Sequence, residues 1–258
     1  MKVIVGWSDT PGSAAAVVWA KDLVARLGGE IRLVHAVSTF PIATYEGVTE
    51  VARMFEAAMA AQSERAKAAC DSLKASGVTA SFVVDHAIPA DMVLREAESW
   101  QADLIIVARR EMGRIGHLIL GSNSAHIVRR AKVATLVVHG EPPTDRPLGV
   151  LAALDESPSA SRALSLAKTL WPAAHFAAVT VTDEGCDPPL ACVKAAGNVP
   201  ITACAGSPLE VFGTRARDGV QDVFAVGRRG LGFFAELLMG SVSERVVALA
   251  KGAVLVVP

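Results

Sequence analysis

The sequence has almost no excess of charge of either sign, with 25 Lys and Arg against 26 Asp and Glu. That balance argues against a nucleic-acid binder that neutralises phosphates over a broad basic face. No stretch of about 18 apolar residues lacks a charge or a helix breaker, so no membrane span is expected. The hydrophobic content of 52% excludes intrinsic disorder. What remains is a soluble, core-rich chain of one or two domains.

Cysteine is scarce, and no two cysteines have C-x-x-C spacing. The four are Cys70, Cys186, Cys192 and Cys204. No histidine lies near them at a zinc-like interval, so we expect no metal site and reduced thiols. Met1 and Lys2 lead directly into the apolar run Val3–Val5, without the longer apolar segment of a secretory signal. We therefore expect a cytoplasmic protein.

Several catalytic signatures are also missing. The sequence contains no G-x4-G-K-[S/T] phosphate loop, and the glycines of residues 227–232 do not have dinucleotide-fingerprint spacing. The six histidines form no recognisable arrangement with an acid and a serine. We therefore assign no catalytic residue and disfavour a P-loop ATPase or a dehydrogenase.

An internal repeat organises what is present. Each half opens with a short apolar run, a polar turn containing proline and an alanine-rich helical pattern; Pro158 lies 147 residues after Pro11. Each half closes with a second shared block, in which Gly240-Ser241 follows Gly121-Ser122 at an offset of 119 residues. The second copy has therefore lost 28 residues internally. The loss falls on the helical stretch 49–76, which residues 182–198 replace with little more than a turn of helix.

Short strands rich in Val and Ile alternate with helices in both copies, which predicts an α/β fold with parallel sheets covered on both faces. We expect two tandem doubly wound, Rossmann-like domains of five strands each, at residues 1–140 and 148–258, joined by a proline-rich linker. The last strands, 133–138 and 253–257, are expected to meet edge to edge, which makes an intrachain pseudo-dimer and hides two open edges.

A glycine pattern follows the fourth strand of the second copy. Gly227 and Gly230 flank Arg228 and Arg229, and nine residues later Gly240 and Ser241 open a helix. Glycines allow backbone amides to approach an anion closely, and a helix start favours phosphate. The arginines are candidates to fork onto phosphate oxygens. The spacing alone also fits an ordinary strand-to-helix loop that binds no ligand. The two arginines are as compatible with a solvated basic turn as with phosphate contacts.

The pattern G-x2-G-x9-G-[S/T] resembles the ATP-binding signature of the universal stress protein family. The resemblance covers the whole chain as a tandem pair, of the adenine nucleotide alpha hydrolase-like fold. It implies that Asp155, in the turn Asp155–Pro158, reaches the nucleoside. It also implies that the end of the second strand, at Val181, lines the adenine pocket, and that the segment 240–243 contacts phosphate. The implied contacts in that segment include Val242 and Ser243, whose hydroxyl is alternatively a helix cap.

The first copy departs from this pattern. Its two earlier glycine positions are Ala108 and Glu111, and Ser8 stands where the second copy has Asp155, with Asp9 next to it. A carboxylate at Glu111 would repel phosphate, even beside Arg109, and the added Cβ atoms would block close backbone approach. We therefore expect the first copy to pair with the second rather than to bind a nucleotide.

The sequence thus predicts a stress-response binding and signalling module with one site for ATP, or for ADP or AMP, and with magnesium able to accompany the phosphates. Its partners would be the adenine nucleotide and the paired half, with a homodimer also open, and without nucleic acid or membrane. Two alternatives stay open. One is a non-nucleotide interaction module of the same fold, and the other is a slow ATPase, since no group is poised as a general base.

Overall fold

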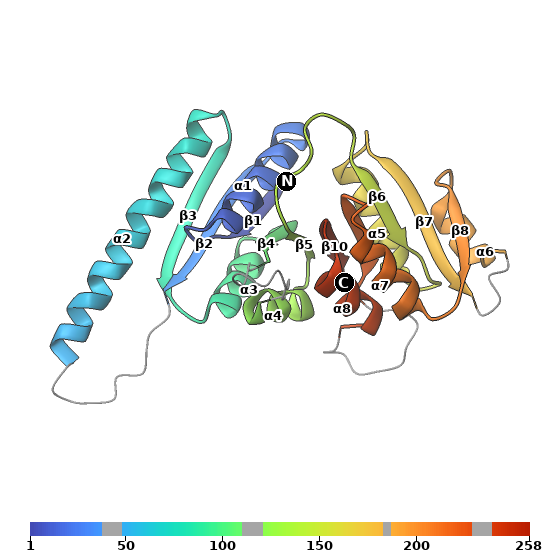
Figure 1. Ribbon diagram of the computed structural model, residues 1–258. Coiled ribbons are helices and arrows are strands. Elements are labelled where there is room, and N and C mark those ends of the chain that lie inside the picture. Colours follow the sequence, from blue (N-terminus) through green and yellow to red (C-terminus); the bar gives the residue numbers. More distant parts are fainter. Residues whose placement is uncertain (38–47, 110–120, 183–186, 229–238) are drawn as a thin grey trace.

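The computed structural model describes residues 1–37, 48–109, 121–182, 187–228 and 239–258 (Figure 1). The first half of the chain contains five strands and four helices. The strands are β1 (Lys2–Gly6), β2 (Glu30–Val37), β3 (Thr79–His86), β4 (Leu104–Ala108) and β5 (Ala134–Val138). The helices are α1 (Pro11–Leu27), α2 (Val48–Ala75), α3 (Pro89–Ser99) and α4 (Ser122–Arg130).

The second half repeats this order. Its strands are β6 (Gly149–Ala153), β7 (His175–Thr182), β8 (Ile201–Ala205), β9 (Val223–Gly227) and β10 (Ala253–Val257). Its helices are α5 (Pro158–Leu170), α6 (Leu190–Ala196), α7 (Pro208–Asp218) and α8 (Ser241–Leu249). The predicted alternation of strands and helices is confirmed. The deletion is confirmed as well, because the 7-residue α6 stands where the first half has the 28-residue α2.

Proline and hydroxyl side chains fix where the helices begin. Helices α1, α3, α5 and α7 all start at a proline, whose ring presets the helical φ and whose missing N–H needs no partner there. Thr10 caps α1 by accepting a hydrogen bond from the amide of Ser13, and Ser157 caps α5 by accepting one from Ala160. The repeated turns found in the sequence are therefore helix starts.

All ten strands form one sheet, in the order β3-β2-β1-β4-β5-β10-β9-β6-β7-β8. Strands are parallel within each half, and β5 pairs antiparallel with β10 at the centre, where Leu136 lies opposite Leu255. This confirms the predicted edge-to-edge pairing and the intrachain pseudo-dimer. Because Leu255 is the repeat counterpart of Leu136, the pairing is symmetric about that point.

Helices cover both faces of the sheet. Side chains of α1, α2, α5 and α6 pack in one apolar cluster, and those of α3, α4, α7 and α8 pack in a second. Both clusters run through both halves, so the core is continuous across the β5–β10 pair. In Figure 1, α2 runs along β3 at one end of the molecule, and the much shorter α6 lies near β8 at the other.

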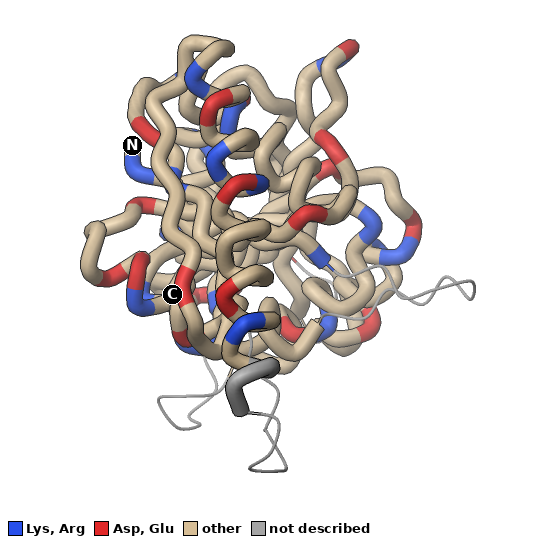
Figure 2. Tube along the Cα trace, turned by 90° about the vertical axis from the view of Figure 1, so that its left-hand side faces the viewer, with Lys and Arg blue, Asp and Glu red and all other residues tan. Residues whose placement is uncertain are grey.

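Charged residues are distributed over the surface with both signs interspersed, as the trace in Figure 2 shows for one side of the molecule. None of the described helices combines the length and the apolar content that crossing a bilayer requires.

Candidate functional site

The strand order of each half reverses once, and the carboxyl ends of the strands beside that reversal are the usual ligand site of such sheets. In the second half the reversal lies between β6 and β9, which pair with Ala152 opposite Ala225. Asp155 follows β6 and Gly227 ends β9. The fold therefore brings the predicted acidic turn and the predicted glycine loop to one place.

Gly227 lies against the start of α5. A Cβ atom on Gly227 would be 2.5 Å from Ser159 Oγ and 2.7 Å from the backbone nitrogen of Ala160. No side chain can be added there without moving the helix. The first glycine of the pattern is thus required by helix-on-strand packing, independently of any ligand.

Asp155 shapes the turn between β6 and α5. Its Oδ1 atom accepts hydrogen bonds from the backbone amide of Ser157, at 3.0 Å, and from the Ser157 hydroxyl. The Ser157 Oγ in turn lies 3.3 Å from the amide of Ala160, which it caps. Asp155 remains partly exposed at the strand ends, where its carboxylate is held in one orientation.

The start of α8 is the segment predicted to contact phosphate. Gly240 is the N-cap residue, with φ −63° and ψ 146°, and no side chain among the described residues caps this helix start. Ser241 is exposed and Val242 is partly buried. The first amides of a helix point out of its N-terminus, so this end offers donors and a positive field to an anion.

The carbonyl oxygen of Arg228 ties β9 to α8. It accepts a hydrogen bond from the Gly240 amide at 2.8 Å and lies 3.0 Å from the Ser243 hydroxyl. Ser243 is buried, and its hydroxyl also lies 3.0 Å from the Gly240 carbonyl oxygen. The Ser243 hydroxyl is therefore engaged by backbone carbonyls where the end of β9 meets the start of α8. Its contact with phosphate stays a prediction.

The Arg228 side chain crosses to the other half, where its guanidinium donates to the carbonyl oxygen of Ala131. Arg229 and Gly230, the remaining residues of the predicted phosphate loop, lie outside the described residues. Val181 lies near the carboxyl end of β7, opposite Cys204 on β8. Beside it, Thr180 is buried and its hydroxyl contacts the Cys192 sulfur at 3.7 Å, while burial raises the pKa of that thiol.

The first half has a different arrangement at the same place. Asp9, next to Ser8, pairs with Arg65 of α2 at 3.1 Å, so its carboxylate is directed towards that helix. Ser8 Oγ lies 3.1 Å from Ser13 Oγ, within the start of α1. Glu111 lies outside the described residues.

The arginine that follows each fourth strand has a role that the sequence pattern does not indicate. Beside Glu111, Arg109 suggests only charge compensation, yet its guanidinium is buried and reaches across the boundary between the halves. The recurrence of Arg109 as Arg228 at the 119-residue offset is the signal that could have revealed it.

No cluster of three or more His, Cys, Asp or Glu residues is arranged within the described part of the chain to hold an ion. Cys70, Cys192 and Cys204 are free thiols, and Cys186 lies outside the described residues.

Comparison with known proteins places the chain in context. The universal stress protein family model matches residues 1–139 and 192–258, so the segment that carries Asp155 and Val181 is not part of the match. A universal stress protein of Mycolicibacterium smegmatis is 29% identical over 170 residues, 63% of this chain and 57% of that protein. One from Thermus aquaticus is 33% identical over 133 residues, 51% of this chain and 91% of that protein. The chain thus matches little more than half the length of the first relative.

A solved structure extends the likeness to the whole fold. A universal stress protein from Archaeoglobus fulgidus superimposes with a TM-score of 0.69 at 19% identity, covering 99% of this chain and 97% of that one. Together with the repeated α/β halves and the family match over most of its length, this shows that the chain belongs to the universal stress protein family.

Proposed function

We propose that the second half of the chain binds an adenine nucleotide, with ATP as the principal candidate, and that the protein is a stress-response binding and signalling module. The observation that carries this proposal is the start of α8. Gly240 and Ser241 begin a helix beside the carboxyl end of β9, and the Arg228 carbonyl holds the two elements together. That arrangement suits phosphate groups because the first helix amides are directed outward.

The residues at this place fit a nucleotide. Gly240 and Ser241 present no bulky side chain at the helix start, and Asp155 is fixed by Ser157 at the neighbouring strand end. In the proposed complex the amides of Ser241 and Val242 hold phosphate oxygens, and Asp155 accepts hydrogen bonds from the ribose. The end of β7 at Val181 flanks the base. Magnesium would accompany the phosphates, whose charge it partly neutralises.

The described residues supply binding rather than catalysis. Asp155 is engaged in a turn, and Ser243 donates to the backbone carbonyl of Arg228 at the end of β9. Neither is placed as a base with a nucleophile beside it. A function as a nucleotide-dependent switch or carrier therefore fits this site better than rapid hydrolysis.

One observation favours the alternative of a protein-interaction module. The short α6 leaves two apolar side chains in solvent, with Leu190 68% and Val193 40% exposed. Such residues in a shortened region suit contact with another protein. A test of nucleotide binding separates the two functions.

Nucleotide binding is tested by mass spectrometry of the compounds released from purified, denatured protein and by thermal unfolding in millimolar ATP. A ligand at 100 times its Kd stabilises the folded state by about 2.7 kcal/mol, a readily measured shift in Tm. Gly240→Val should abolish that shift because its side chain covers the first amides of α8. The matched variant Gly121→Val, at the start of α4, should keep it. An unliganded protein without any ATP-dependent shift would contradict the proposal and favour the interaction module.

A further inference from the structure

Two arginines make reciprocal contacts across the boundary between the halves. Arg109, which follows β4, donates to the carbonyl oxygens of Ala248 and Ala250 at the end of α8. Arg228, which follows β9, donates to the carbonyl oxygen of Ala131 at the end of α4. Arg228 and Ala250 lie 119 residues after Arg109 and Ala131, so the two contacts are related by the same repeat as the sheet.

Each arginine therefore holds the C-terminal end of a helix in the opposite half. The last carbonyl groups of a helix have no partner within it and carry partial negative charge, which a guanidinium satisfies well. Arg109 is 3% exposed, and burial lowers its pKa. A guanidinium buried to that degree depends on well-placed acceptors, so its geometry is closely defined.

The helix that Arg109 holds is the one whose other end forms the proposed phosphate site. Helix α8 has nine residues, a length of roughly 13 Å, so its two ends move together. The second half's site is also linked to the first half through Arg228. The amide of Arg228 donates to the Val257 carbonyl, and the carbonyl of Arg228 accepts from the Gly240 amide. The guanidinium of the same residue donates to the end of α4 in the first half.

We propose that Arg109 and Arg228 are positioning residues for the nucleotide site of the second half, so that the first half is a structural part of that site. This inference rests on the proposed nucleotide function. It gives the first half a task although its own glycine pattern is altered. Arg109 fixes the end of α8, and Arg228 ties the end of β9 to the start of α8 through its carbonyl.

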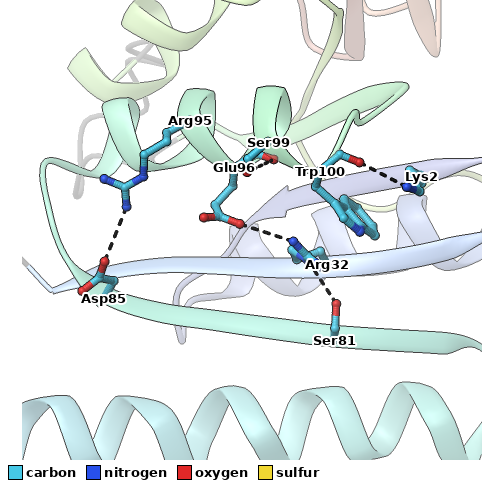
Figure 3. A network of polar contacts seen from close by, with 8 residues as sticks. All are labelled: Lys2, Arg32, Ser81, Asp85, Arg95, Glu96, Ser99 and Trp100. Atoms are coloured by element: carbon cyan, nitrogen blue, oxygen red, sulfur yellow. Dashed lines mark hydrogen bonds and ion pairs between the residues drawn. The ribbon is translucent and has the colours of Figure 1, made fainter.

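The test uses the full chain and compares Arg109→Met, Arg109→Lys and Arg228→Met with a matched control. Arg32→Met is that control, because Arg32 is also partly buried but its contacts with Ser81, Glu96 and Trp100 lie within the first half (Figure 3). Its guanidinium lies 4.3 Å from the centre of the Trp100 ring, 3.4 Å from Glu96 and 3.3 Å from Ser81. Replacing it should lower Tm without changing the nucleotide site.

The readouts are the Kd for ATP, measured about 20 °C below each variant's Tm, and hydrogen exchange of the α8 amides without nucleotide. We expect Arg109→Met and Arg228→Met to raise Kd about tenfold and to speed exchange in the first turn of α8. Arg109→Lys, which keeps one cationic donor, should recover part of the affinity. Arg32→Met should leave both readouts unchanged.

Unchanged Kd and exchange in a folded Arg109→Met protein would overturn the inference, as would an equal change in Arg32→Met. If Arg109→Met does not fold, Arg109→Lys and Arg228→Met decide the question. If the wild-type protein binds no ATP, the proposed function fails, whereas exchange in α8 still shows whether the arginines position that helix.

Discussion

The two halves differ in which element carries a side chain where a helix packs on the end of the fourth strand. That strand ends in Ala108 in the first half (β4) and in Gly227 in the second (β9). In the first half α1 contributes Gly12, and a Cβ there would lie 3.2 Å from Ala108 Cβ. In the second half α5 contributes Ser159, whose Oγ occupies the space where a Gly227 side chain would go. At this contact the side chain belongs to the strand in the first half, as Ala108, and to the helix in the second half, as Ser159.

This exchange bears on the altered glycine pattern of the first half. The sequence predicts that the Cβ of Ala108 blocks the approach of the backbone to a phosphate, and that stays a prediction. The structure shows how Ala108 fits into the fold, where Gly12 faces it and leaves room for its Cβ. The residue type at the first glycine position is therefore constrained by helix packing in both halves.

The largest expected effect comes from Gly227→Ala. Its Cβ would lie 2.5 Å from Ser159 Oγ and 2.9 Å from the Ser159 carbonyl carbon, and backbone atoms cannot rotate away. We expect a loss of about 3 kcal/mol in the free energy of unfolding, measured by urea denaturation. The matched change Gly12→Ala meets neighbours only at 3.2 and 3.3 Å and gains helix propensity, so its net effect should be under about 1 kcal/mol.

Adding Ser159→Gly to Gly227→Ala copies the first half's arrangement. It should recover part of the lost stability, because one of the close contacts disappears while those with the α5 backbone remain. Equal free energies of unfolding for Gly227→Ala and Gly12→Ala would show that the two contacts tolerate an added Cβ atom equally well.

The fold could be predicted from local sequence patterns because each pattern determines the type or the boundary of one helix or strand. Prolines at helix starts, Val- and Ile-rich strands and the repeat spacing gave the element order, the parallel sheets and the pairing of the last strands. The contacts of Gly227 with Ser159, and of Arg109 with α8, join residues far apart in the chain. The direction of a side chain such as Arg228 depends on how the halves meet. Its position between glycines is equally compatible with phosphate contact and with a solvated turn, and neither indicates the contact with the end of α4 that the structure shows.

A second comparison concerns the aspartates that join the first and fourth strands of each half. Asp103 Oδ2 accepts the Lys2 amide at 2.6 Å, and Asp222 Oδ2 accepts the Gly149 amide at 2.7 Å. Asp222 additionally binds Arg146 through both carboxylate oxygens. Burial alone would raise the pKa of Asp222, but the bonds from Arg146 and Gly149 and the Arg146 charge together hold it below its usual value.

Asp222→Asn should therefore lower the free energy of unfolding by about 1–2 kcal/mol at pH 7. A depressed pKa in the folded state means that the carboxylate's contribution is complete above its unfolded pKa, near 3.9. It is lost as the pH falls through the lower folded value. The variant and the wild type should thus begin to converge as the pH falls below about 4, and the convergence should be complete only below the lowered folded pKa, as measured by denaturation across pH. Asp103→Asn should cost less at pH 7, because no arginine among the described residues pairs with Asp103. A gap for Asp222→Asn that stays constant down to pH 2 would refute this account.

The smallest expected change in stability is at the start of α8, where Glu244 stands at the position of Ala125 in the first half. Glu244 pairs with Arg129 of α4, and both side chains are nearly half exposed, at 49% and 44%. Glu244→Ala should change the free energy of unfolding by no more than about 0.5 kcal/mol, since exposed ion pairs contribute little.

The same substitution should strengthen nucleotide binding, because a carboxylate in the first turn of α8 repels phosphate at that end of the helix. We expect Kd for ATP to fall about threefold at low salt and the difference to shrink as salt screens the charge. Arg129→Gln should have the opposite effect, since it removes the cation that offsets Glu244. Calorimetry at two ionic strengths measures both. Weaker binding by Glu244→Ala would mean that this carboxylate takes part in holding the ligand, for example through magnesium, and that the second half differs from the first by an added ligand group rather than by a tolerated charge.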